Sequence, residues 1–199
     1  MQPWDVEQLE IEDATGNRWA QPFTNLRGTA ATWGFGMPFY LPTNELLKVR
    51  FTLAKLKDFA PEELWTITNL ALPALNQRLK LTNAITKREG LTFSLPEIES
   101  TGAFRNGRVN GSFDLRMDIR MHFQVAPFDE AAKSWRIVNL DALRSGRYSQ
   151  FPTCYAFDAQ SIHPSEYFPP VNTGENARLR LALTKAITIE FLARPNVID

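Results

Sequence analysis

Residues 113–125 read Phe-Asp-Leu-Arg-Met-Asp-Ile-Arg-Met-His-Phe-Gln-Val, so apolar and polar side chains alternate strictly. Because the side chains of a β-strand alternate between its two faces, this pattern places every apolar residue on one face. At ~3.3 Å per residue the strand would span roughly 40 Å, about twice the usual length. The stretch predicts a β-rich fold built around one long strand whose apolar face is buried.

A second long strand is predicted near the C-terminus. Its apolar positions share one face: Leu179, Leu181, Leu183, Ile187, Ile189 and Phe191. Lys185 interrupts this face, which predicts a bulge or an exposed end close to it. Two strands of such length favour an antiparallel barrel or sandwich, or a hairpin that protrudes and pairs with another subunit.

Shorter strands and turns are predicted elsewhere. Val6 to Phe23 is expected to form a hairpin, with Thr15-Gly16-Asn17 in its turn. Asn106-Gly107 is the dipeptide most typical of a hairpin turn, and Asn110-Gly111 follows four residues later, just before the long strand. Further strands are expected at Leu47–Leu53, Leu91–Leu95 and Trp135–Leu140. Residues 145–174, which contain several prolines, are expected to be a long loop with short elements.

Residues 59–88 carry signals of a helical insertion. Asp58 is a possible cap, Pro61 suits an early helical position, and Glu62 and Glu63 favour the N-terminal end of the helix dipole. Gly90 would end the segment. Pro73 lies inside it and predicts a kink or a helical hairpin. The expected fold is therefore mainly β, a barrel or sandwich over residues 1–199 as one domain, with a helical insertion at about 59–88.

The composition excludes few classes of function. The chain has 199 residues, with 22 Lys plus Arg and 22 Asp plus Glu, so net charge gives no indication of nucleic-acid binding. Cys154 is the single cysteine, which excludes an intramolecular disulfide and favours the reducing cytoplasm. No signal peptide and no apolar run of ~18 residues is recognisable, so neither secretion by that route nor a spanning helix is expected.

The polar face of the long strand is the most suggestive constellation. It carries Asp114, Arg116, Asp118, Arg120 and His122. Two carboxylates and a histidine are typical metal ligands, but the arginines between them would repel a cation. The alternatives are a solvated face of cross-strand ion pairs and a subunit interface whose alternating charges fix the register between copies.

No motif of known catalytic chemistry is present. His163 belongs to a His-x-x-Glu pattern, which is a weak metal signal, and His122 is the only other histidine. The sequence contains no nucleophile elbow, phosphate-binding loop or dinucleotide-binding glycine motif. We therefore expect no enzyme activity and no cofactor. A metal-dependent enzyme that uses His122 or His163 stays open as an alternative.

Aromatic residues outside the patterned strands are candidates for contacts between subunits, because aromatics dominate interface energetics. A sugar- or base-stacking platform is the other interpretation of such residues. The candidates are Trp33, Phe35, Phe39, Tyr40, Tyr155, Tyr167 and Phe168.

The run from Glu45 to Ile85 contains Leu47-Lys48-Val49-Arg50-Phe51 and then Leu56-Lys57-Asp58-Phe59-Ala60-Pro61-Glu62-Glu63-Leu64. This run resembles a strand-to-helix segment of the small sheath subunit of type VI secretion systems, and Leu72-Pro73-Ala74-Leu75 falls where that family places its next helix. The resemblance covers about a fifth of the chain, and Leu91 to Asp199 departs from the family. It implies a component of a phage-tail-like or capsid-like assembly.

Together these patterns predict a non-enzymatic structural subunit that self-assembles into a particle, tube or filament, in the cytoplasm or in a particle assembled there. Its expected partners are copies of itself and other particle components. The alternative is a monomeric β-cradle that binds a peptide, glycan or lipid.

Overall fold

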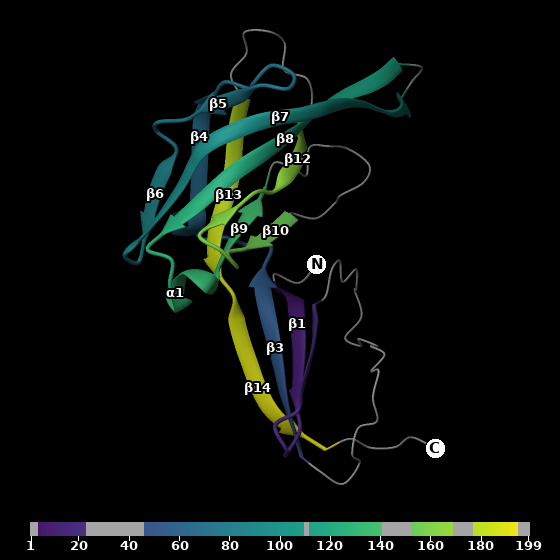
Figure 1. Cartoon of the computed structure of the whole chain (residues 1–199), viewed down its shortest axis with the longest axis vertical. Helices are drawn as coiled ribbons and strands as arrows, with labels where there is room; N and C mark the ends of the chain where they lie inside the picture. The colour runs from purple at the N-terminus through teal and green to yellow at the C-terminus, as the bar shows by residue number, and fades with distance from the viewer. Residues whose placement is uncertain (1–3, 23–45, 110–111, 141–152, 169–176, 195–199) are drawn as a thin grey trace. The chain divides into compact units, whose positions relative to one another are not determined.

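The structure is a computed structural model that describes residues 4–22, 46–109, 112–140, 153–168 and 177–194 (Figure 1). At residues 21–22, 102–109, 112–117, 166–168 and 177 it describes the backbone alone. The chain divides into a terminal unit, residues 1–57 with 186–199, and a central unit, residues 58–185. The expectation of one domain over residues 1–199 stays a prediction.

The terminal unit contains an antiparallel sheet in the order β14-β3-β1-β2. Its strands are β1 (Trp4–Glu12), β2 (Arg18–Pro22), β3 (Leu47–Lys55) and β14 (Ile187–Ala193). Leu9, Ile11, Leu47 and Val49 form its buried cluster, because the period of two turns them to one face. The predicted N-terminal hairpin and the strand at Leu47–Leu53 are confirmed.

The opposite face of this sheet is polar, and ion pairs of one arginine on this face connect three strands. Arg50 of β3 pairs with Glu10 and Glu12 of β1, at 2.5 and 3.3 Å, and with Glu190 of β14 at 2.5 Å. The hydrogen bonds that Arg50 donates to Glu190 and Glu10 raise the pKa of Arg50, and the hydrogen bond that Glu190 accepts from Arg50 lowers the pKa of Glu190. These cross-strand pairs attach β14 to the sheet.

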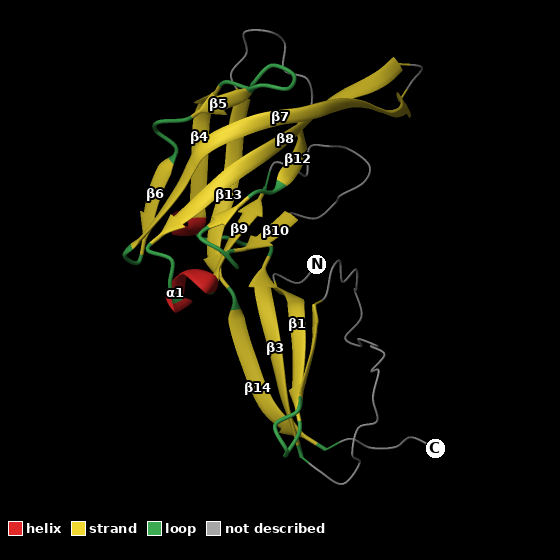
Figure 2. Cartoon of the chain, in the orientation of Figure 1, coloured by secondary structure: helices red, strands yellow, loops and turns green. Residues whose placement is uncertain are grey.

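The central unit consists of two sheets that face each other as a sandwich (Figures 1 and 2). One sheet has the order β10-β9-β13-β4, and its strands are β4 (Leu64–Leu70), β9 (Trp135–Asn139), β10 (Thr153–Ala156) and β13 (Ala177–Lys185). The other has the order β11-β8-β7-β5, and β6 and β12 also pair with it. Its strands are β5 (Arg78–Lys80), β6 (Ile85–Arg88), β7 (Leu91–Val109), β8 (Ser112–Ala126), β11 (Ser161–Ile162) and β12 (Ser165–Phe168). A mainly β sandwich is therefore confirmed.

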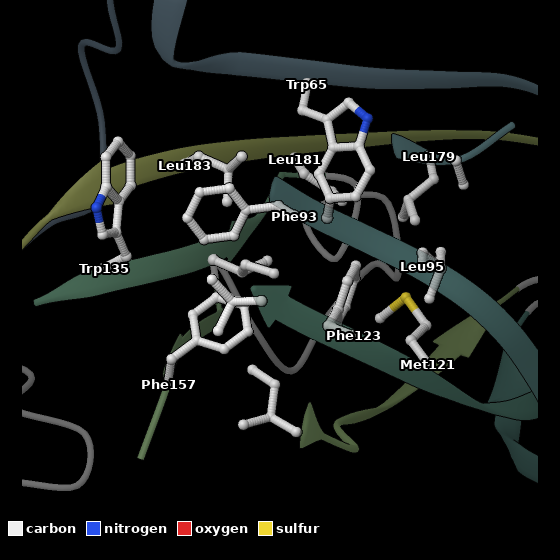
Figure 3. Close-up of a cluster of buried hydrophobic side chains, with 14 of the residues drawn as sticks. Trp65, Phe93, Leu95, Met121, Phe123, Trp135, Phe157, Leu179, Leu181 and Leu183 are labelled. Atoms are coloured by element: carbon white, nitrogen blue, oxygen red, sulfur yellow. The ribbon is translucent and has the colours of Figure 1, made fainter. Parts of the chain in front are cut away.

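Apolar faces of both sheets build the core of the central unit (Figure 3). Phe93 of β7 packs its ring 5.2 Å from that of Trp135 and 5.5 Å from that of Phe157. Trp65 of β4 meets Phe123 of β8 at 6.2 Å. Each such large side chain stabilises the fold by about 1.5–3 kcal/mol through burial. The core thus depends on aromatic contacts between the two sheets.

The long strand predicted from residues 113–125 is confirmed as β8. Its apolar face is buried where the side chains are described: Ile119, Met121, Phe123 and Val125 are each at most 1% exposed. A turn at Asn106-Gly107 is wrong, because β7 continues past these residues with an irregular register. The other predicted turn dipeptide, Asn110-Gly111, lies outside the described residues, and Val109 and Ser112 on either side of it are paired.

The helical insertion predicted at 59–88 is wrong. Pro61–Glu63 form one 3-10 turn (η1), which β4, β5 and β6 then follow. Glu63 accepts a hydrogen bond from the amide of Ala60, so the capping signals serve this single turn. Trp65 and Leu70 are buried in the sandwich core, and β4 pairs with β13, which makes the extended conformation more favourable. In the described residues the only α-helix is α1 (Glu130–Lys133) (Figure 2).

The C-terminal stretch is two strands rather than one. β13 ends at Lys185 and β14 begins at Ile187, so the predicted interruption near Lys185 is confirmed while the single long strand is wrong. The two strands belong to different units and pair with different neighbours. The strand-to-helix resemblance of Glu45 to Ile85 also fails. Its strand is present as β3, but the 3-10 turn η1 and the strand β4 stand where the resemblance places a helix.

Candidate functional site

A cluster of charged side chains lies on the outer face of the sheet that contains β7 and β8. Glu97 is opposite His122 and Glu99 is opposite Arg120 in the register of these strands, while Arg78 of β5 is opposite Glu99. Residues directly opposite each other share a face, so the sheet itself brings these five side chains together. We call Arg78, Glu97, Glu99, Arg120 and His122 the charged cluster.

Glu99 is the most buried member of the charged cluster, with a side chain 10% exposed. Arg78 Nε lies 2.6 Å from its Oε2, and Arg120 Nη1 lies 3.2 Å from its Oε1. Arg78 also approaches Glu97 Oε1, at 3.4 Å. A buried carboxylate needs such partners, because losing solvent is costly for a charge.

His122 places its Nε2 between the two glutamates, 3.8 Å from Glu97 Oε1 and 3.8 Å from Glu99 Oε2. This nitrogen is buried and makes no hydrogen bond within the described part of the chain. The ring of His163, which lies between β11 and β12, stands 4.6 Å from the ring of His122 at an angle of 61°. Burial, followed by the charge of His163, lowers the pKa of His122. The neutral imidazole is therefore favoured here.

Of the polar face predicted on the long strand, the structure brings Arg120 and His122 into the charged cluster. Asp118 lies farther along β8 and is half-buried, and its Oδ1 makes no hydrogen bond within the residues described. Asp114 and Arg116 lie on β8 with only their backbone described.

The predicted aromatic candidates lie apart from the charged cluster or outside the description. Tyr155 is on β10 and packs against the core of the sandwich. Tyr167 and Phe168 are on β12, opposite Asp118 and Met117, with only the backbone described. The remaining four lie outside the described residues: Trp33, Phe35, Phe39 and Tyr40.

Sequence reasoning missed Glu97, Glu99 and Arg78 as site residues. The alternation Glu97-Ile98-Glu99 was a usable signal, since Ile98 is fully buried between two polar residues. The expected strand ended at Leu95, whereas β7 continues to Val109 with an irregular register between Ser94 and Glu97. Arg78 offered no local signal, because only strand pairing brings it to Glu99.

A second candidate surface is the β14 edge in the terminal unit. We define it as the exposed side chains of β14 together with the side of this strand that faces away from β3. Among the described strands β14 pairs with β3 alone. On the apolar face of the sheet, Ile187, Ile189 and Phe191 are 42%, 47% and 45% exposed, and Leu192, on the opposite face beside Lys48, is 63% exposed. The ring of Phe191 stacks on that of Phe51 at 6.0 Å, so it extends the apolar face of the sheet to its border.

A third candidate surface is the β7–β8 arm, residues 103–109 and 112–116. β5 pairs with β7 only at Glu97–Glu99, and β12 pairs with β8 only as far as Met117. Beyond these positions β7 and β8 pair with each other alone among the described strands, and the ribbon extends past the rest of its sheet (Figure 1). Two-stranded ribbons are marginally stable by themselves in water.

Comparisons with protein-family models, curated proteins and solved structures give no match for this chain. None of the helices in the described residues is both long enough and apolar enough to cross a membrane.

Proposed function

We propose that this chain is a non-enzymatic structural subunit that self-assembles into a particle, tube or filament. The observation that carries the proposal is the β14 edge, where four large apolar side chains are 42–63% exposed on a strand with one described partner. Such an edge offers unpaired amide and carbonyl groups to another chain. Covering its side chains would also remove apolar surface from water.

The charge pattern of β14 favours pairing with a strand of another copy. Edge strands are commonly protected by charged side chains that repel a second strand. Glu190 is the one charged residue of β14, and Arg50 and Lys48 neutralise it at 2.5 and 3.4 Å. The edge therefore lacks an uncompensated charge that would deter a second copy.

The sequence of β14 is self-complementary in one antiparallel register. When two copies pair about Ile189, Ile187 of each copy lies opposite Phe191 of the other, and Thr188 lies opposite Glu190. Pairing about Glu190 would instead place two carboxylates opposite each other, which is unfavourable. We therefore expect a two-fold contact centred on Ile189.

A two-fold contact by itself closes a dimer, so a larger assembly needs a second contact. The β7–β8 arm is our candidate for it, since a free ribbon gains stability when another surface covers it. The sequence predicts an apolar face for the arm at Phe113 and Leu115. The two contacts would be made by different units and are separable by mutation.

Sedimentation velocity of the purified chain at high micromolar concentration and physiological salt tests the proposal. The wild type should sediment as species heavier than the 22.7 kDa chain, and Ile189→Lys should shift it toward smaller species. Ile85→Lys is the matched control, because Ile85 is 55% exposed on β6 of the central unit. Circular dichroism checks that each variant keeps its strands.

A wild type that remains monomeric under these conditions would contradict self-assembly. It would favour a monomeric β-cradle, in which the β14 edge takes an extended peptide as an added strand. Electron microscopy of the same sample adds the class of assembly, since particles, tubes and filaments are distinguished by eye.

A further inference from the structure

We propose that Glu97, Glu99 and His122 form a binding site for a divalent transition-metal ion of the Zn²⁺ type, with His163 as a fourth ligand. Metal binding goes beyond the proposed assembly function. The three residues lie on the outer face of a sheet in the central unit, whereas the β14 edge belongs to the terminal unit. Imidazole nitrogens and carboxylate oxygens are common ligands of zinc.

The donor atoms are already close to the spacing that such an ion requires. One ligand atom from each of Glu97, Glu99 and His122 lies within 4.8 Å of the other two. His122 Nε2 is 3.8 Å from each carboxylate oxygen. Zinc–ligand distances of ~2.0–2.2 Å place tetrahedral ligands about 3.3–3.6 Å apart. The two distances from His122 Nε2 therefore exceed this spacing by only a few tenths of an ångström, and the Glu97 and Glu99 side chains would close the remaining gap.

The nitrogen of His122 is the observation that distinguishes this cluster from an ordinary set of ion pairs. Its Nε2 is buried, points between two carboxylates and makes no hydrogen bond within the described residues. A buried polar atom without a partner is costly, and a metal ion would satisfy it. Neutral imidazole, with one ring nitrogen free to accept, is the form of histidine that binds metals.

The positive side chains around the cluster oppose a cation, and their geometry shows how the ion would be admitted. Arg78, which binds Glu99 Oε2, has a side chain 66% exposed and is free to turn into solvent. Arg120 binds the other oxygen, Oε1, and stays in place when the ion replaces Arg78. Lys80 is exposed opposite Glu97 and also has access to solvent. Arg78 is thus the competitor of the metal.

His163 lies outside the group of three donor residues that already meet, but its ring centroid is 4.6 Å from that of His122, so a turn of its exposed side chain would make it the candidate fourth ligand. It is exposed, and the neighbouring Pro164 is attached to β8 by a hydrogen bond from the amide of Met121 to its carbonyl. The backbone next to His163 is therefore fixed beside His122. With His163 the set becomes two imidazoles and two carboxylates, which is enough for a closed four-coordinate site.

Isothermal titration of the chelator-treated full chain with ZnCl₂ tests the assignment. The wild type should bind one ion per chain. His122→Asn and Glu97→Gln should each weaken binding at least tenfold, and His163→Asn should weaken it less. Arg78→Ala should tighten binding several-fold, since it removes the competing cation. Glu62→Gln, a change at an exposed glutamate in η1, is the matched control and should bind as the wild type does.

Absence of stoichiometric zinc binding to the wild type would overturn the assignment. Binding that His122→Asn leaves unchanged would do the same, because the ion would then be held elsewhere. Circular dichroism of each variant separates loss of ligand from loss of fold. Weaker binding by Arg78→Ala would show that the arginine supports the site rather than competing with the metal, which contradicts the proposed route of entry.

Discussion

His122 shows how one residue is governed by the groups around it. Burial and the nearby His163 lower its pKa, while the carboxylates of Glu97 and Glu99 act in the opposite direction and Arg78 adds to the lowering. Burial is the largest of these effects. The folded protein therefore binds a proton at His122 less readily than the unfolded chain does.

The stability of the protein should consequently depend on pH through His122. Below the ordinary histidine pKa of ~6.5 the unfolded chain takes up a proton that the folded chain resists, so the free energy of unfolding falls as pH decreases from about 7.5 to 5.5. Urea unfolding at several pH values should show this decrease. In the variant His122→Asn the free energy of unfolding should depend less on pH. Equal pH dependences for wild type and variant would contradict the role of His122.

Asp13 stabilises the turn between β1 and β2. Its carboxylate accepts hydrogen bonds from the amides of Thr15 and Asn17 at 2.9 Å each, and from both side chains. The side-chain bonds lower the pKa of Asp13 to about 2. The positive φ of Gly16, 87°, completes the reversal without strain.

Asp13→Ala should lower the thermal midpoint of the protein at pH 7, because these four hydrogen bonds are lost. The stabilisation is present above the ordinary aspartate pKa of ~3.9 and disappears as pH falls toward 2. The difference in midpoint between wild type and variant should therefore shrink on acidification. A difference that stays constant from pH 7 to pH 2 would show that the charge of Asp13 is not what holds the turn.

At the scale of the element, β8 is buried on one face and polar on the other. Ile119 is 1% exposed and faces the core of the sandwich, whereas Gln124 is exposed on the other face. The neighbouring β7 occupies one side of β8 over most of its length, and β11 and β12 pair with short parts of the other. The effect of a polar substitution in β8 on the stability of the protein should consequently depend on the face on which the new side chain lies.

Ile119→Asp should destabilise the protein by at least ~3 kcal/mol, since it buries a charge without a partner. Gln124→Asp, on the opposite face of the same strand, should change stability by less than about 0.5 kcal/mol. Denaturant titration followed by circular dichroism measures both. Similar stabilities for the two variants would contradict the assigned faces of β8.

At the scale of the whole molecule, the two units have separate buried clusters, one around Leu9 and Leu47 and one around Phe93 and Phe123. The chain passes between the units after Lys57 and after Lys185. Separate clusters predict that damage to one unit leaves the other folded, whereas a single domain would lose both together.

The variant Leu9→Ala distinguishes two separate units from a single domain. Leu9 is 0% exposed in the terminal unit, so its truncation should lower the free energy of unfolding by ~2–5 kcal/mol. Hydrogen exchange followed by mass spectrometry should show faster exchange in β1, β2, β3 and β14, with protection of β7, β8 and β13 unchanged. Loss of protection in both units to the same degree would support one cooperative domain over residues 1–199.

Much of the architecture was predictable because strand formation on a half-buried face leaves a local signal. The alternation in residues 113–125 and Leu47–Leu53 predicted β8 and β3, and the charge of Lys185 predicted the break between β13 and β14. Capping signals around Pro61 misled, because they fit one 3-10 turn as well as a long helix. Burial of Trp65 against Phe123 then decided in favour of a strand.

The sequence by itself determined a β-rich chain with one long amphipathic strand, because the period of two is a property of neighbouring residues. Only the tertiary structure decided the division into two units and the composition of the charged cluster. Arg78, Glu97 and His122 lie far apart in the sequence and meet through the register of β5, β7 and β8. Register depends on backbone pairing between distant segments, and no local pattern encodes which residues it places opposite each other.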